Sequence, residues 1–231
     1  MKREAGPGAI RSSLEILAIL ALTPVGLVLG GLSGSAALSS ITGVALSVGA
    51  ATLFLRASGE SWRSIGFGRA MPVKRFVGFT AAALLGSYVA TTFLVTPVMK
   101  ALGAPPLEIG LLTRLIEGDL VSYLIFLLPI AWGSAAFGEE LIARGFILHR
   151  FSNLFGDGVA IVAQAALFAL AHAYQGPVGM ANIFALALVF GMVYVRCGRN
   201  LWPVIVAHGL VDTVGITLIY LGRADLLLGA S

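Results

Sequence analysis

The sequence has little charge and almost no cysteine. Only 11% of its 231 residues are charged, whereas ordinary soluble domains carry about 25%. Cys197 is the single cysteine, so an intrachain disulfide is impossible and a disulfide-stapled secreted scaffold is excluded. The sequence also has no internal repeat, low-complexity tract or Ser/Pro-rich linker. We therefore expect a single domain.

Hydrophobic residues take the place of the missing charges. They make up 58% of the chain, and the mean hydropathy is +0.96. This composition excludes a disordered chain and an ordinary soluble enzyme, and it predicts an integral membrane protein. The formal charge of +4 does not indicate nucleic acid binding, because the basic residues lie between apolar runs and not in one patch.

Apolar runs long enough to cross a bilayer recur along the chain, since a transmembrane helix needs about 20 largely apolar residues. The candidate spans are 14–32, 36–55, 76–98, about 122–148, 158–175, 180–195 and 201–220. The sequence thus predicts an all-α, polytopic bundle of about seven spans. Residues 1–120 would supply three N-terminal spans and an outer loop, and residues 121–220 a helical core.

Basic residues are distributed unevenly between the connections. If the N-terminus is cytoplasmic, the cytoplasmic segments hold 12 basic residues and the opposite segments hold 3, namely Lys100, Arg114 and Arg223. Positive charge accumulates on the cytoplasmic side of membrane proteins. We therefore expect a cytoplasmic N-terminus, a non-cytoplasmic C-terminus and a location in the plasma (inner) membrane.

Ionisable residues at membrane depth fall on only three of the predicted helices. Such groups are costly unless paired or solvated, so each is a candidate functional residue. They are Glu139, Glu140, Arg144, His172, His208 and Asp212. At 1.5 Å per residue, Glu139 lies about 16 Å, His172 about 21 Å and His208 about 14 Å from the cytoplasmic ends of their helices. Helices of opposite direction therefore bring these groups to one layer.

Helical spacing predicts pairs among these groups. Glu140 and Arg144 are four residues apart with the glutamate first, which is the favourable order for an ion pair. Glu139 points about 100° away from Glu140, which leaves it free to face a cavity and act as a general base. His208 and Asp212 are also four residues apart, so the carboxylate could orient the imidazole.

Structural roles stay open for the same residues. The two glutamates would form an interfacial charge cluster if their helix ended near Phe137. Independently of this, His208 and Asp212 could serve as an interhelical hydrogen-bonding device. We expect Gln164 to pack between helices and His149 to be interfacial.

Three short motifs carry a resemblance to a known family. They read Glu139-Glu140-Leu-Ile-Ala-Arg144, Phe168-Ala-Leu-Ala-His172 and His208-Gly-Leu-Val-Asp212. In type, order and spacing the sequence resembles, over about residues 121–220, the CPBP intramembrane proteases, which include the type II CAAX prenyl endopeptidases and the abortive-infection proteins. Ala143 stands where the family more often has Phe. Asp212 stands where the prenyl proteases tend to have Asn, which bears on prenyl-protein specificity more than on hydrolysis.

The resemblance implies hydrolysis of a peptide bond inside the membrane, in a cavity open to the cytoplasm, with 121–220 as the catalytic core. It implies that Glu139 and His172 activate a water molecule. His208 and Asp212 would stabilise the oxyanion of the tetrahedral intermediate or orient its donors, with Asp212 holding His208. The supporting residues would be Glu140, Arg144 and Phe168. The substrate would be a membrane-associated protein or peptide, CAAX-like or other.

The resemblance leaves the use of a metal open. The family is commonly called metalloprotease, and Glu139, His172 and His208 could supply three ligands for a catalytic zinc ion, with Glu140 or Asp212 behind them. However, the sequence has no His-Glu-x-x-His motif and no pair of histidines four residues apart. It therefore allows zinc and favours metal-free hydrolysis.

Two other functions also stay open. A membrane scaffold or immunity-type protein could keep the three motifs without turnover. A proton-coupled transporter could use Glu, His and Asp at mid-membrane depth, but it would be expected to carry polar residues on more spans. Residues 36–55 and 76–98 contain no charged side chain, which counts against the transporter. The sequence gives no indication of the oligomeric state.

Overall fold

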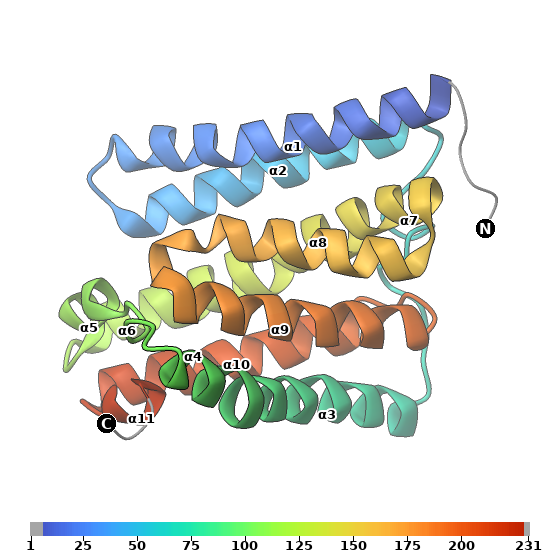
Figure 1. Cartoon of the computed structure of the whole chain (residues 1–231). Coiled ribbons are helices and arrows are strands. Elements are labelled where there is room, and N and C mark those ends of the chain that lie inside the picture. Colours follow the sequence, from blue (N-terminus) through green and yellow to red (C-terminus); the bar gives the residue numbers. More distant parts are fainter. Residues whose placement is uncertain (1–6, 229–231) are drawn as a thin grey trace.

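The computed structural model describes residues 7–228, and every regular element in that range is a helix. The longer helices lie side by side in one bundle (Figure 1). The elements are α1 (Pro7–Gly31), α2 (Ala36–Ala57), α3 (Val73–Val89), η1 (Ala90–Val95), α4 (Thr96–Ala101), α5 (Gly110–Ile116), α6 (Leu120–Ile125), η2 (Phe126–Glu139), η3 (Leu141–Leu148), α7 (His149–Phe155), α8 (Asp157–Ala171), η4 (Ala173–Gln175), α9 (Gly176–Arg196), α10 (Trp202–Tyr220) and α11 (Asp225–Leu228). The predicted all-α, polytopic bundle is confirmed.

Six helices in the described part of the chain are long and apolar enough to cross a membrane. They cover Gly8–Gly31, Ala36–Ala57, Val73–Ala101, Leu120–Phe155, Ala173–Arg196 and Trp202–Tyr220. The seventh predicted span, 158–175, is shorter than expected, because α8 has 15 residues and ends at Ala171. At 1.5 Å per residue α8 is about 22 Å long, against about 30 Å for the hydrocarbon core of a bilayer.

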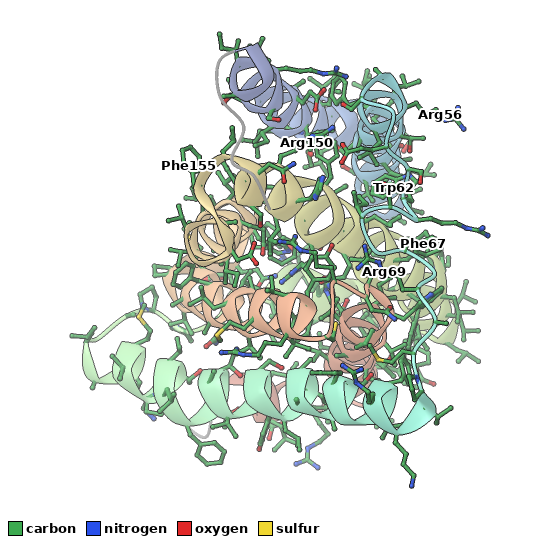
Figure 2. All side chains as sticks on the ribbon, turned by 90° about the vertical axis from the view of Figure 1, so that its right-hand side faces the viewer. Arg56, Trp62, Phe67, Arg69, Arg150 and Phe155 are labelled. Atoms are coloured by element: carbon green, nitrogen blue, oxygen red, sulfur yellow. The ribbon has the colours of Figure 1, made fainter. Side chains whose placement is uncertain are left out.

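The chain reverses direction between successive long helices, so the start of α1 and helix α11 lie at opposite ends of the bundle (Figure 1). Figure 2 looks on to the end at which α1 begins. The connections and helix ends on that side carry Arg11, Arg56, Arg63, Arg69, Lys74, Arg75, Arg150, Arg196 and Arg199. The connections on the opposite side carry Lys100, Arg114 and Arg223. Lys2 and Arg3, which the predicted charge bias also includes, lie outside the described residues.

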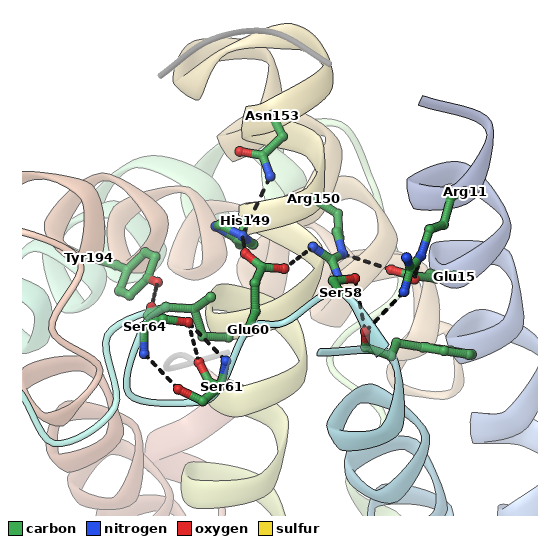
Figure 3. A network of polar contacts seen from close by, with 12 residues as sticks. Arg11, Glu15, Ser58, Glu60, Ser61, Ser64, His149, Arg150, Asn153 and Tyr194 are labelled. Carbon is green, nitrogen blue, oxygen red and sulfur yellow. Dashed lines mark hydrogen bonds and ion pairs between the residues drawn. The ribbon is translucent and has the colours of Figure 1, made fainter. Parts of the chain in front are cut away.

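A buried arginine ties the α1–α2 hairpin to the rest of the bundle at this basic end (Figure 3). Arg150, at the start of α7, is only 3% exposed. Its Nε donates to Glu15 of α1 at 2.8 Å, and one Nη donates to Ser58, just after α2, at 3.1 Å. The other Nη pairs with Glu60 in the loop before α3. Arg11 contacts the same Glu15 at 2.8 Å, so this carboxylate joins two arginines from different helices.

Glu60 also pairs with His149, with 2.7 Å between Nε2 and Oε1. The hydrogen bond with His149 lowers the pKa of Glu60 from 4.5 to about 2, and Arg150 adds to this effect, while partial burial opposes it. His149 is therefore part of an internal polar network, in addition to the interfacial position that the sequence predicts.

The lowered pKa of Glu60 predicts a pH dependence of stability. Because the folded state holds this carboxyl as the anion to lower pH than the unfolded chain does, the stabilisation is present above about pH 4.5 and is lost as pH falls towards 2. We expect the thermal unfolding midpoint of the wild-type protein to fall more steeply over that range than that of Glu60→Gln. Glu108→Gln, which alters an exposed carboxyl at the other end, should keep the wild-type slope. Identical slopes for wild type and Glu60→Gln would contradict the prediction.

Candidate active site

The first motif lies on an unusual helical segment. Glu139 ends η2, Arg144 lies within η3, and Glu140 stands between the two elements. In these π-helical elements the backbone hydrogen bonds run from residue i to i+5, which widens each turn, and such turns are frequent at functional sites. The apolar pattern of the sequence predicts only a helix here and does not reveal its π geometry.

Glu140 and Arg144 form the ion pair that their spacing predicts. Both side chains are fully buried, and Arg144 donates through Nη1 to Oε1 of Glu140 at 2.7 Å. The same oxygen lies 2.9 Å from Nδ1 of His208 on α10. Since an ionised carboxylate only accepts hydrogen bonds, the His208 Nδ1–H is the donor. Arg144 also reaches the carbonyl of Ala187 on α9, at 3.5 Å.

Two phenylalanines enclose the charged end of Arg144. Its guanidinium carbon lies 4.8 Å from the ring centroid of Phe168 on α8 and 5.3 Å from that of Phe190 on α9. The same two rings meet the ring of His208 edge-on, with centroid distances of 6.4 and 6.1 Å. A cation over an aromatic face is stabilised by the ring quadrupole, more strongly where water is excluded. Phe168, the first residue of the second motif, therefore contacts Arg144 of the first motif and His208 of the third.

His172 is held at the end of α8. Its Nδ1 lies 2.8 Å from the carbonyl oxygen of Phe168, and the two rings are 4.7 Å apart. Because a carbonyl oxygen only accepts, the Nδ1 of His172 must carry a proton. In the neutral imidazole the lone pair is then on Nε2, for which the structure gives no hydrogen-bond partner among the described residues.

Two carboxylates contact the ring of His208. Asp212 Oδ2 lies 3.6 Å from Nε2, at ion-pair distance but longer than a hydrogen bond. Glu140, on another helix, makes the closer contact through Nδ1. The sequence predicts the first of these contacts and not the second. Spacing along one helix places His208 and Asp212 together, whereas the contact with Glu140 depends on how α10 packs against the π-helical segment.

Glu139 differs from its neighbour in having no ionic partner in the described part of the chain. Its side chain is partly buried, and Oε2 is inaccessible to solvent and makes no hydrogen bond to any described residue. The ring of Phe168 lies 4.7 Å from that of His172 and 6.4 Å from that of His208. The Tyr174 ring lies 5.8 Å from that of His172. The residues of all three motifs thus lie close together.

Two glycines allow the helices to approach at this point. Gly209 follows His208, and a Cβ at that position would lie 2.6 Å from the ring of Trp132 on η2. Gly138 precedes Glu139, and a Cβ there would overlap Val44 of α2. Small residues let transmembrane helices pack backbone to side chain. Both glycines therefore bring a motif residue close to a neighbouring helix.

The predicted zinc ligands do not assemble around a common point. Among the residues that the structure describes, no three His, Cys, Asp or Glu side chains gather closely enough to hold a metal ion. The Nδ1 atoms of His208 and His172 are bound to Glu140 and to the Phe168 carbonyl, which leaves Nε2 of each ring as the atom that would have to bind a metal. The use of zinc stays a prediction from the resemblance.

Sequence reasoning did not find three groups that complete the site: Phe190, Tyr174 and the carbonyl of Ala187. Phe190 and Ala187 lie in a uniformly apolar helix, and nothing in their sequence context distinguishes them from other core residues. Tyr174 could have been identified from the sequence, because it lies two residues after His172, at the end of an apolar helix.

Comparison with known proteins gives one family. Residues 121–214, which include all three motifs, match the family described as type II CAAX prenyl endopeptidase Rce1-like. No curated protein and no solved structure matches the chain. The match starts at the helix that carries the first motif and ends just beyond Asp212, so it contains every catalytic and supporting residue that the sequence predicts. Over this segment the chain, an integral membrane protein, is similar to the Rce1-like type II CAAX prenyl endopeptidases.

Proposed function

We propose that the protein is an intramembrane endopeptidase that hydrolyses a peptide bond of a membrane-associated protein or peptide. The observation that carries the proposal is the difference between the two neighbouring glutamates. Glu140 is bound by Arg144 and His208 through Oε1, whereas Glu139 is only partly buried and has no ionic partner among the described residues. A carboxylate that no cationic side chain engages can bind a water molecule and accept its proton.

In the proposed mechanism Glu139 is the general base. A carboxylate with one unpaired oxygen can accept a proton from a water molecule, and the resulting hydroxide attacks the carbonyl carbon of the scissile bond. His172 helps to position that water through Nε2, because its Nδ1 is fixed on the carbonyl of Phe168. The proton held by Glu139 can then pass to the leaving amine as the tetrahedral intermediate collapses.

In the same proposal, His208 stabilises the charge that develops on the substrate oxygen. Its Nδ1 is anchored by Glu140, and its Nε2 faces the side on which Asp212 lies. An imidazole fixed in this way, carrying a proton on Nε2, can donate to an oxyanion. Asp212, whose Oδ2 lies 3.6 Å from Nε2, helps to orient the same ring. Each of these steps uses the chain's own side chains and one water molecule.

The same proposal includes a substrate class and an orientation. The family match supports a CAAX-like substrate, prenylated or not, that reaches the site from the membrane. The charge bias along the bundle supports a plasma-membrane protein with a cytoplasmic N-terminus and a non-cytoplasmic C-terminus. Residues 58–72, between α2 and α3, would then face the cytoplasm.

Reporter fusions test the orientation. A reporter placed within residues 56–75 should be cytoplasmic, and one fused after Ser231 should lie on the opposite side of the membrane. Activity of both reporters on one side would contradict the proposed topology, although the three motifs could still lie together.

Peptide cleavage tests the function. Purified wild-type protein is incubated with a panel of membrane-anchored peptides, including prenylated and unprenylated CAAX peptides. We expect cleavage of at least one, and a fall in kcat of at least about 10²-fold for Glu139→Gln, because general-base catalysis typically contributes 10²- to 10⁴-fold. The thermal unfolding midpoint of Glu139→Gln should match wild type, and Glu117→Gln should keep full activity. Binding of the peptides without cleavage by the wild-type protein would favour a scaffold instead.

Loss of Arg144 should affect folding more than chemistry. Arg144→Ala removes the arginine partner of the buried Glu140 carboxylate and leaves it only His208; breaking a buried ion pair typically costs about 3–5 kcal/mol. We expect a lower unfolding midpoint and a reduced yield of folded protein. Arg56→Ala, which removes an exposed arginine from the end of α2, should change stability by less than about 0.5 kcal/mol. Equal effects of Arg144→Ala and Glu139→Gln on yield would contradict this division between a structural and a catalytic residue.

A further inference from the structure

Gln164 on α8 is the largest polar side chain in the described residues that is both fully buried and wholly unpaired. Its exposed fraction is 0%, and neither Oε1 nor Nε2 makes a hydrogen bond to any described residue. An amide can donate two hydrogen bonds and accept two. A buried amide without any of them is unfavourable, so such a side chain calls for a specific explanation. Packing alone would be served better by leucine or methionine.

The helix packing places Gln164 beside the Glu140–Arg144 pair. Ile161, three residues before Gln164 on α8, packs against Gly191 of α9: a Cβ on Gly191 would lie 3.2 Å from it. Leu148 of η3 lies beside the same glycine. Four residues after Gln164, Phe168 covers the guanidinium of Arg144. Residues spaced by three and four share one helix face. Gln164 therefore lies on the face of α8 that packs against α9 and η3, between Ile161, which lies near Leu148, and Phe168, which covers Arg144.

Arg144 has an unpaired group of its own on this side of the bundle. Its Nη1 binds Glu140 and its Nη2 reaches Ala187, but Nε is buried and has no partner among the described residues. A guanidinium Nε–H can only donate. Gln164 and Arg144 do not bond each other directly, so any group that satisfies both must accept from Nε–H and also hydrogen-bond the amide.

We propose that Gln164 and the Nε of Arg144 bind a buried water molecule between α8 and η3, which makes Gln164 a positioning residue for the proposed peptidase site. Water is the smallest molecule that can accept from Arg144 and donate to the amide oxygen of Gln164. Buried waters typically make about three hydrogen bonds to groups that the protein leaves unsatisfied. By fixing Nε, the water holds the guanidinium plane, and through Glu140 it fixes the ring of His208. The positioning role rests on the proposed function, but the water site does not.

The sign of a stability change tests the water site. If Gln164 and Arg144 share a water, Gln164→Met removes a partner of that water and should lower the thermal unfolding midpoint of the full chain in detergent. If the amide meets only carbon atoms, the near-isosteric Gln164→Met should unfold at the same or a higher temperature, and the proposal is overturned. Thr80→Val is the matched control, because Thr80 on α3 also has a buried, unpaired hydroxyl but lies outside the motifs. It should not lower the midpoint.

An experimental density map of the wild-type protein gives a second readout that does not depend on how the variant folds. Density for a water within hydrogen-bonding distance of both Arg144 Nε and the Gln164 amide would support the site. Well-resolved side chains with no such density would overturn it. Both measurements hold even if no peptide is cleaved, so failure of the water site and failure of the peptidase proposal can be distinguished.

Kinetics test the positioning role. With a peptide that the wild-type protein cleaves, Gln164→Met should lower kcat about tenfold, equivalent to about 1.4 kcal/mol in the barrier, with KM changed less than about twofold. This split is expected because Gln164 touches no substrate and acts through Arg144, Glu140 and His208. Thr80→Val should leave both constants unchanged. An unaltered kcat in a Gln164→Met protein of lowered stability would overturn the positioning role.

Discussion

The candidate site depends on one buried ion pair. Moving Glu140 and Arg144 out of water is costly, and their attraction offsets that cost only when the geometry is good and further hydrogen bonds are made. Here one carboxylate oxygen serves both Arg144 and His208, and the guanidinium also lies over Phe168 and reaches α9. The pair therefore joins the π-helical segment to α8, α9 and α10, the helices that carry the other two motifs and cover the site.

This pairing also explains how two adjacent glutamates can differ in chemistry. The charge of Glu140 is neutralised by a partner one turn away, so it fixes neighbouring groups and is not available to react. Glu139 projects in another direction and has no ionic partner among the described residues, whereas Glu140 has two. At the basic end of the bundle, Arg150 plays a comparable structural part for the α1–α2 hairpin, joining Glu15 and Glu60 from separate segments. In both places a buried arginine joins several helices.

Much of this arrangement could be predicted from the sequence, because hydropathy and residue spacing report local geometry directly. The helical bundle, the Glu140–Arg144 pair and the common layer of polar groups follow from these patterns. Contacts between helices do not follow from these patterns. The spacing along one helix predicts the contact of His208 with Asp212, but not its hydrogen bond to Glu140 on another helix. The length of α8 was also missed, since the apolar run continues past the residue at which the backbone leaves the helix, His172.

The π-helical stretch from Phe126 to Leu148 has a consequence for how the site can vary. Drawn as a plain α-helix, the 36 residues of Leu120–Phe155 would measure about 54 Å, far more than a bilayer core of about 30 Å requires. A π-helix has more residues per turn and per unit length than an α-helix. The segment around the first motif therefore contains more residues than an α-helix of the same length would. Loss or gain of a single residue there could convert part of it to α-helix and rotate Glu139 relative to Arg144. The number of residues per helical turn, as well as the side chains themselves, thus determines how the residues of this site are oriented.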